Sequence, residues 1–365
     1  MTDKLEQKKN SNITPLDLSK KKDLNLPDEF IDKTEVHEIL SANIGRWIDQ
    51  WFKFLIEWYR NAYNTFNDID KYFILIYLIQ KSFRHYADHF IIYTEEAFYS
   101  KAEFEIEKIN LIEISQDLKI PKETVRRKIN EMTRDNVISR KGKKIVITPK
   151  AFQYQRPRQS IKLMSGVLST CSKYLSTQEW FGAPASSDNI EKFTRQNFTL
   201  VWRFYFRFAI PYLTRQRQFY GDLETALVAG IIYANQSSKV KEHIISQPLT
   251  TSPLNEGVGA ARNYVTWMKT VVNYNGKITG VNASSISEIT GIPRATVIRK
   301  LNHIEKKELT FKDKNQLYIL GKKYKKYIKE LEKMFVISQT DLSKFVTTFF
   351  DLYKKDELTV KKISE

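Results

Sequence analysis

The sequence predicts a mainly α-helical protein with two small β-hairpins, built by duplication of one unit. Three observations lead to this fold class: a repeated segment, helical spacing of apolar residues within it, and a short alternating pattern after each copy. The copies are NLIEISQDLKIPKETVRRKIN at Asn110–Asn130 and NASSISEITGIPRATVIRKLN at Asn282–Asn302. Ten of the 21 aligned positions are identical at a constant offset of 172 residues. Unrelated segments of this length would share about one or two.

Each copy opens with a short helix. Asn110 precedes Glu113 by three positions, a pairing typical of a helix N-terminus, and Asn282 is the equivalent cap residue in the second copy. Apolar residues at helical spacing then mark a single face. These residues are Leu111, Ile114 and Leu118 in the first copy and Ile286 and Ile289 in the second.

A two-residue turn leads to a second helix in both copies. The helix is expected to start at Pro121 and Pro293, because proline lacks the N–H group that would be unpaired at the first helical position. Lys119 occupies the turn position that Gly291 holds in the second copy. A positive φ at this position would therefore strain the first turn.

The second helix has one apolar stripe and an opposite basic face. The stripe consists of Val125, Ile129 and Met132 in the first copy and Val297, Leu301 and Ile304 in the second. The basic face carries Lys122, Thr124, Arg126, Arg127 and Asn130 in the first copy and Arg294, Thr296, Arg299, Lys300 and Asn302 in the second. Arginine and asparagine suit the guanine and adenine edges of the major groove, and threonine in the first turn suits a phosphate.

The offset of 172 residues continues beyond this helix. It aligns Ile145 with Leu317 and Ile147 with Ile319, and such alternation predicts a strand. The preceding Arg140-Lys141-Gly142-Lys143-Lys144 is typical of a hairpin turn, and its counterpart Lys312–Asn315 is less basic. Each copy is therefore expected to end in a β-hairpin.

Helix, turn, basic helix and hairpin together resemble the winged helix-turn-helix domains of bacterial transcription regulators, in two tandem copies. The shared motif is I-S-x-x-x-x-I-P-x-x-T-V-x-R-K, and the resemblance covers about 45 residues per copy, near 108–152 and 280–324. It implies that Pro121–Thr133 and Pro293–Glu305 lie in the major groove. It also implies that the hairpin wings, Ser139–Ile147 and Phe311–Ile319, touch the neighbouring DNA backbone.

The net charge of +17 lies in the same two regions. Residues 119–150 carry a net charge of +8 and residues 291–329 carry +9, so the rest of the chain is neutral. A charge excess confined to two predicted groove-binding units indicates a polyanionic partner, with counterion release as the driving force. A lysine-rich surface that serves only solubility would spread its charge more evenly.

Aromatic-rich segments precede each copy. Arg46–Tyr63 and Trp202–Tyr212 have the spacing of amphipathic helices, and further helices are expected to begin near Asp68 and Asp222. These starting points are 154 residues apart, so the second half has about 18 extra residues, which fit the Ser-, Pro-, Thr- and Gly-rich segment 237–259. We therefore expect one unit of two helices plus a winged domain, duplicated and fused.

Composition divides the chain into five parts. It predicts a disordered basic tail over 1–33, a first unit over 36–157, a linker over 158–194, a second unit over 195–329 and a helical extension over 330–365. The terminal helices are expected to pack back on the core or to pair between subunits, which leaves a homodimer open. Helically spaced aromatic residues favour core packing over an effector pocket, and the sequence identifies no small-molecule effector.

Several functional classes are not supported by the sequence. No apolar stretch approaches the roughly 18 residues of a membrane span, and no signal region is visible. The single Cys171 fits a reducing cytoplasm, so a bacterial, cytoplasmic protein without a membrane partner is expected. His85 and His89 lack the glutamate of the zinc-protease motif, and no phosphate-binding loop or nucleophile elbow occurs. We therefore expect no metal, no cofactor and no enzymatic activity.

These patterns predict sequence-specific binding of double-stranded DNA, and transcriptional regulation, through two adjacent half-sites about 34 Å apart. The site should be an imperfect palindrome or a direct repeat, because the two basic faces differ. Predicted base contacts are Arg126, Arg127, Asn130 and Arg299. Predicted phosphate contacts are Thr124, Thr296, Lys128, Lys300 and the first wing with Arg140, Lys141, Lys143 and Lys144, and Lys122, Arg294, Asn302 and His303 complete the expected DNA surface.

Two other functions remain compatible with the sequence. One is a plasmid-type replication initiator, since one family of these also carries two winged domains. The other is a winged-helix module that binds protein and not DNA. The arginines on both exposed faces disfavour the protein-binding alternative, because a protein-binding face more often has apolar anchors. The paired arginines and basic wing of the first copy make it the expected affinity anchor.

Overall fold

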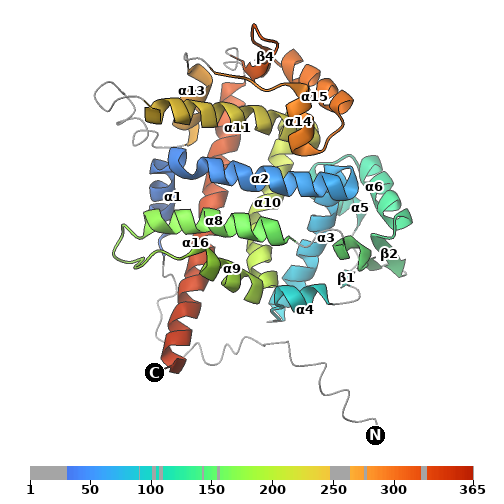
Figure 1. The fold of residues 1–365 in the computed structure, drawn as a ribbon. Coiled ribbons are helices and arrows are strands. Elements are labelled where there is room, and N and C mark those ends of the chain that lie inside the picture. Colours follow the sequence, from blue (N-terminus) through green and yellow to red (C-terminus); the bar gives the residue numbers. More distant parts are fainter. Residues whose placement is uncertain are drawn as a thin grey trace.

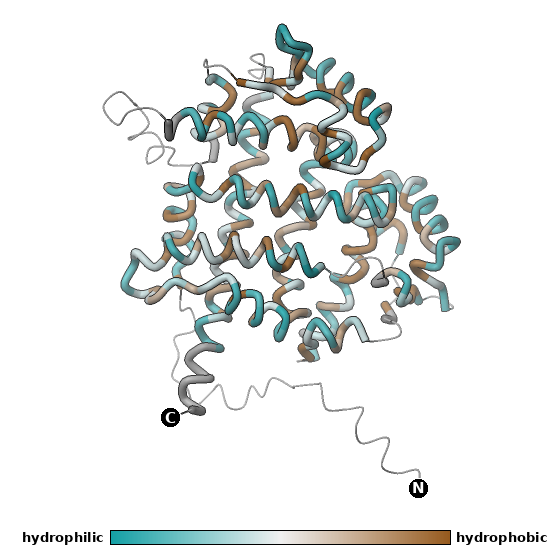
Figure 2. The backbone as a smooth tube through the Cα atoms, viewed as in Figure 1, coloured by the Kyte–Doolittle hydropathy of each residue, from teal (hydrophilic) through white to brown (hydrophobic). Residues whose placement is uncertain are grey.

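The computed structural model describes residues 31–89, 91–100, 104–106, 110–141, 144–153, 157–246, 264–274, 278–321 and 327–364. This part of the chain is mainly α-helical with two small antiparallel sheets, as the sequence predicted (Figure 1). Hydrophobic and hydrophilic residues alternate along the helices, which is the pattern of amphipathic helices packed in one body (Figure 2). Within the described ranges no helix is both long and apolar enough to cross a membrane.

Three successive helices occur twice, at an offset of 154 residues. They are α1 (Lys33–Ala42) and α9 (Ser187–Gln196), α2 (Ile44–Phe66) and α10 (Phe198–Tyr220), and α3 (Ile69–Asp88) and α11 (Leu223–Ser246). The first two pairs agree in length, and their first helices are both capped by a side chain, that of Asp32 or Ser186. The duplication therefore extends farther towards the N-terminus than the sequence indicated.

The repeated segment itself forms two helices and a hairpin in each copy. The helices are α5 (Leu111–Leu118) and α14 (Ala283–Thr290), followed by α6 (Lys122–Arg134) and α15 (Arg294–Lys306). The hairpins are β2 (Ile138–Lys141) with β3 (Lys144–Ile147), and β4 (Thr310–Lys312) with β5 (Tyr318–Leu320). A third strand, β1 (Phe104–Ile106), pairs with β3 and was not predicted; in the second copy Val281 forms a single bridge to Tyr318. We call α5–β3 the first unit and α14–β5 the second unit.

A long helix follows each hairpin: α8 (Arg158–Leu175) in the first copy and α16 (Ile328–Ser364) in the second. The predicted linker over 158–194 is therefore wrong, because α8 and most of α9 fall within it. Ile161, Met164, Leu168 and Cys171 recur at helical spacing and are buried in the core. The connection between the two copies is the segment 176–186 alone. We call 33–175 the first repeat and 187–364 the second repeat.

Two further segments differ from the expectation, and the C-terminal extension agrees with it. Residues 1–30 of the predicted disordered tail lie outside the described residues, but Ile31 is buried and Asp32 caps α1. Helix α11 continues to Ser246, so the first part of segment 237–259 is helical. The C-terminal extension is one continuous helix that packs on α1, α10 and α13 (Tyr264–Asn273). The short helices α4 (Glu95–Tyr99) and α7 (Lys150–Gln153) complete the fold.

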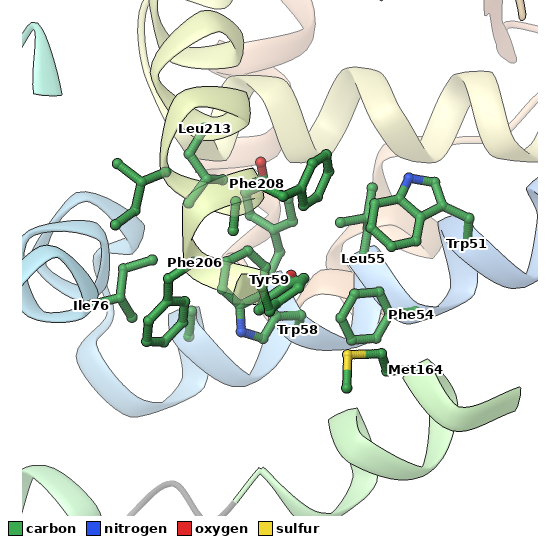
Figure 3. Close-up of a cluster of buried hydrophobic side chains, with 14 of the residues drawn as sticks. Trp51, Phe54, Leu55, Trp58, Tyr59, Ile76, Met164, Phe206, Phe208 and Leu213 are labelled. Carbon is green, nitrogen blue, oxygen red and sulfur yellow. The ribbon is translucent and has the colours of Figure 1, made fainter. Parts of the chain in front are cut away.

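Aromatic side chains from both repeats form one common core. Figure 3 shows Trp51, Phe54 and Trp58 of α2 facing Phe206 and Phe208 of α10. The rings of Trp51 and Phe208 meet edge to face with centroids 5.4 Å apart, a favourable geometry for aromatic pairs. The aromatic stripes predicted as core are therefore core, and the repeats are not separate domains.

Candidate nucleic-acid interface

The turn between the two helices of each unit requires a left-handed backbone residue. Gly291 has φ 74°, and Lys119 at the same position has φ 54° and ψ 37°. A side chain in this region costs roughly 1–2 kcal/mol, so the strain expected in the first turn is present. Pro121 and Pro293 are N-cap residues with ψ 135° and 136°, and each helix begins one residue later than predicted.

The inner faces of α6 and α15 match the predicted apolar stripes. Val125, Ile129 and Met132, like Val297, Leu301 and Ile304, are at most 1% exposed. The side chains of Asn110 and Asn282 cap α5 and α14, because their Oδ1 atoms accept the backbone N–H groups of Ile112 at 3.0 Å and of Ser285 at 2.8 Å. Glu113, expected to complete the first cap, instead accepts a hydrogen bond from Nζ of Lys81 at 2.6 Å, which ties the first unit to α3.

The outer faces carry the predicted polar residues in equivalent places. Lys122, Arg126, Arg127 and Asn130 are exposed on α6, and Arg294, Arg299, Asn302 and His303 are exposed on α15. Thr124 and Thr296 are half-buried in the first turn of each helix. Each outer face therefore presents one arginine and one asparagine at the same positions of the repeat, Arg127 with Asn130 and Arg299 with Asn302.

Two predicted phosphate contacts are wrong. Lys128 is buried and paired with Asp68, and Nζ of Lys300 lies 2.6 Å from Oδ2 of Asp222. Both aspartates cap the N-terminus of the next helix, α3 or α11, by accepting a backbone N–H. The aliphatic stems of both lysines point inward, and each ammonium group finds its carboxylate there, so neither reaches a phosphate. The sequence contains one signal for this pairing, because both partners occur at equivalent positions in the two copies: Lys128 with Lys300, and Asp68 with Asp222.

Two acidic residues that are not among the predicted site residues pair with arginines of the first outer face. Nη2 of Arg126 lies 2.6 Å from Glu123, and Nη1 of Arg127 lies 3.8 Å from Glu131. Glu131 also bonds Nζ of Lys71 at 2.9 Å, and this hydrogen bond is the main cause that lowers its pKa. The second unit has Ala295 and His303 at these two positions. Among the residues that the structure describes, Arg299 forms no ion pair.

The two hairpins differ in the position of their charge. Arg140, Lys141 and Lys144 are exposed on the paired strands β2 and β3, not in the turn as predicted, and Lys143 lies outside the described residues. In the second hairpin Asp313 accepts the N–H groups of Asn315 and Leu317 at 2.8 Å and 2.9 Å and so shapes the turn. The basic surface of the first hairpin is therefore the larger one.

The other candidate sites have ordinary surroundings. His85 and His89 stand at the end of α3, where Nδ1 of His89 lies 2.8 Å from the carbonyl oxygen of His85. Burial raises the pKa of the Cys171 thiol to about 12. Across the described ranges no group of three His, Cys, Asp or Glu side chains is placed to hold a metal ion.

No protein-family model matches the chain, and comparison with curated proteins and with solved structures finds no similar protein. What the two units bind must therefore follow from their own chemistry.

Proposed function

We propose that the protein binds double-stranded DNA sequence-specifically, as a transcriptional regulator with two tandem winged helix-turn-helix domains. One observation carries the proposal. Both units bury the inner face of their second helix and expose arginine and asparagine at the same two positions, Arg127 with Asn130 and Arg299 with Asn302. Retention of the same outward pair in two diverged copies fits a common ligand.

The exposed side chains have the chemistry of base recognition. An arginine guanidinium donates two hydrogen bonds to O6 and N7 of guanine, and an asparagine amide pairs with N6 and N7 of adenine. Helices α6 and α15 have 13 residues each, long enough to present these groups in a major groove.

The remaining exposed cations suit the DNA backbone. Lys122 and Arg294 stand in the first turn of α6 and α15, next to the half-buried Thr124 and Thr296. Cations and hydroxyl groups there reach phosphates and fix the position of the helix without reading sequence. Because the net charge is +17, binding should release many counterions. Lys128 and Lys300 are excluded from this set by their pairing with Asp68 and Asp222.

The salt dependence of binding tests this function. The full-length chain is titrated against a labelled random-sequence duplex between low and high salt, with fluorescence anisotropy as the readout. We expect affinity to fall steeply as salt rises. On a duplex selected from a random library, the double variant Arg127→Ala/Arg299→Ala should lose about 1–3 kcal/mol per arginine.

Arg84→Ala is the matched control. Its side chain is 72% exposed on α3 and lies sixteen residues beyond Asp68, which is about 24 Å along the helix. We expect this variant to bind like the unmodified protein. Absence of duplex binding at low salt, or an equal effect of the control and the double variant, contradicts the proposal.

A further inference from the structure

The two repeats contact each other through reciprocal pairs of helices. Helix α3 of the first repeat packs on α10 of the second, and α2 of the first packs on α11 of the second. In the same way α8 packs on α9, and α1 packs on α16. When element A of one copy touches element B of the other and B also touches A, the copies are related by a two-fold axis. Copies related by translation would make only one contact of each pair.

The turns of the two units are contacted in the same reciprocal way, each by a helix of the other repeat. Nη1 of Arg217, near the end of α10, donates to the carbonyl oxygen of Lys119 at 3.1 Å in the first turn. Asn64, near the end of α2, packs on the second turn, where a Cβ at Gly291 would overlap Oδ1 of Asn64. Each turn is therefore held by the long helix of the other repeat.

A chain of contacts joins α6 and α15 across this axis. The backbone N–H of Ile69 donates to Oε1 of Glu224 at 2.9 Å, so the N-termini of α3 and α11 meet. Beside this contact, Lys128 of α6 pairs with Asp68 and Lys300 of α15 pairs with Asp222. Even with every side chain fully extended, these bonds limit the Cα separation of the two lysines to about 40 Å. Figure 1 shows α6 and α15 on the same side of the view.

We infer that a single molecule reads an inverted repeat whose half-sites are centred one helical turn apart. The inference rests on the proposed DNA binding. DNA sites mirror the two-fold symmetry of the protein that reads them, at spacings of about 34 Å or multiples of it. A limit of about 40 Å leaves only the first of these spacings, and a two-fold axis excludes the direct repeat that the sequence left open.

The two half-sites should agree at some bases and differ at others. Arg127 with Asn130 and Arg299 with Asn302 predict a guanine and an adenine common to both halves. At the neighbouring position Arg126 faces outward in the first unit, whereas the second unit has the half-buried Ile298. Arginine favours guanine there and isoleucine favours the methyl group of thymine, so the palindrome is imperfect at this base.

The test uses the full-length chain in a selection from a random 40-base-pair duplex library at low salt. The selected half-sites are then rebuilt in three labelled duplexes. One has the inverted order at the selected spacing, one has the inverted order with five extra base pairs between the halves, and one has the same halves as a direct repeat. Anisotropy gives the affinities, and sedimentation gives the number of molecules per duplex.

We expect one molecule per duplex and an inverted repeat spaced by 10–11 base pairs. We also expect at least about 100-fold weaker binding to the other two duplexes, because a rigid molecule then engages only one half-site. A selected direct repeat, equal affinity for the half-turn insertion, or two molecules per duplex overturns the inference while leaving DNA binding intact. Failure to enrich any sequence overturns DNA binding itself, and the inference with it.

Discussion

The two units carry their positive charge in different places. On α6 the exposed arginines are interleaved with Glu123 and Glu131, so the surplus charge of the first unit lies on its hairpin. On α15 Ala295 and His303 replace both acids, and in the second hairpin Asp313 shapes the turn. The first unit should therefore attract phosphates mainly through its wing and the second through its helix. The ion pairs of Arg126 and Arg127 leave less free positive charge on the first outer face than its number of basic residues implies.

A second difference lies on the pseudo-two-fold axis. Asp70 and Glu224 are equivalent positions, and Nε of Arg217 lies 3.2 Å from Oδ2 of Asp70. The first repeat has Tyr63 where the second has Arg217, so Glu224 lacks the equivalent cation. Burial, together with the nearby charges of Asp70, Asp222 and Asp68, raises the pKa of Glu224 to about 7. Burial also raises the pKa of Asp70, but Arg217 and Lys128 oppose that rise.

The largest predicted effect concerns Glu224→Gln and pH. The folded carboxyl keeps its proton up to about pH 7, whereas the unfolded one loses it near 4.5, so the unfolded state binds fewer protons between these values. This group therefore lowers the free energy of unfolding as pH rises from about 4.5 to 7, by up to about 3 kcal/mol. Glutamine keeps the acceptor for the N–H of Ile69 and does not titrate, so the variant should be the more stable protein at pH 8.

Urea denaturation at pH 5, 6, 7 and 8 measures this effect as the difference between the variant and the unmodified protein. Asp70→Asn is the matched comparison across the axis. It removes the charged partner of the half-buried Arg217 and should destabilise the fold at every one of these pH values. If Glu224→Gln left the pH slope unchanged, the asymmetry on the axis would have no energetic consequence.

The next largest effect compares the equivalent arginines of α15 and α6. Arg299→Ala should cost about 1–3 kcal/mol of binding to the selected duplex. Arg127→Ala at the equivalent position should cost less, by about 0.5 kcal/mol, because Arg127 must leave Glu131 before it reaches a base. Anisotropy titrations of the two variants in parallel give this difference. A larger loss for Arg127→Ala would support the first unit as the affinity anchor.

A smaller effect is expected on the stability of the fold when the residues of the two turns, Lys119 and Gly291, are exchanged. Gly291→Lys should destabilise the fold by about 1–2 kcal/mol through its positive φ, and the amide of Asn64 must also move to make space for the Cβ. Lys119→Gly should stabilise it by no more than about 1 kcal/mol, because glycine relieves the strain but gains freedom in the unfolded chain. Thermal unfolding compares them, and a destabilising Lys119→Gly would mean that the first turn is not strained.

The features that the sequence predicted are those fixed by local pattern. Helical periodicity predicted the buried stripes of α6 and α15. The constant offset of the repeat predicted both hairpins. The pairing of Lys128 and Lys300 with aspartates was not predictable in this way, because their partners Asp68 and Asp222 are 60 and 78 residues away. Small polar residues such as Ser165 and Ser172 form part of the buried face of α8, so composition does not distinguish this helix from a linker. The packing of the two repeats against each other depends on contacts between residues far apart in the sequence, which no local pattern predicts.

The smallest predicted effect is the change in DNA affinity when one acidic residue is removed from α6 or introduced at the equivalent position of α15. Glu123→Ala should tighten DNA binding by about 0.5 kcal/mol, because it releases Arg126 from its ion pair and removes a negative charge from the outer face. Ala295→Glu, the mirror change, should weaken binding by a similar amount, since it places an acid three residues from Ile298 and four from Arg299. Titrations at two salt concentrations distinguish the cause, because a purely electrostatic effect shrinks at the higher one. If Glu123→Ala weakened binding instead, Glu123 would itself contact a base, for which the amino group of cytosine is the matching donor.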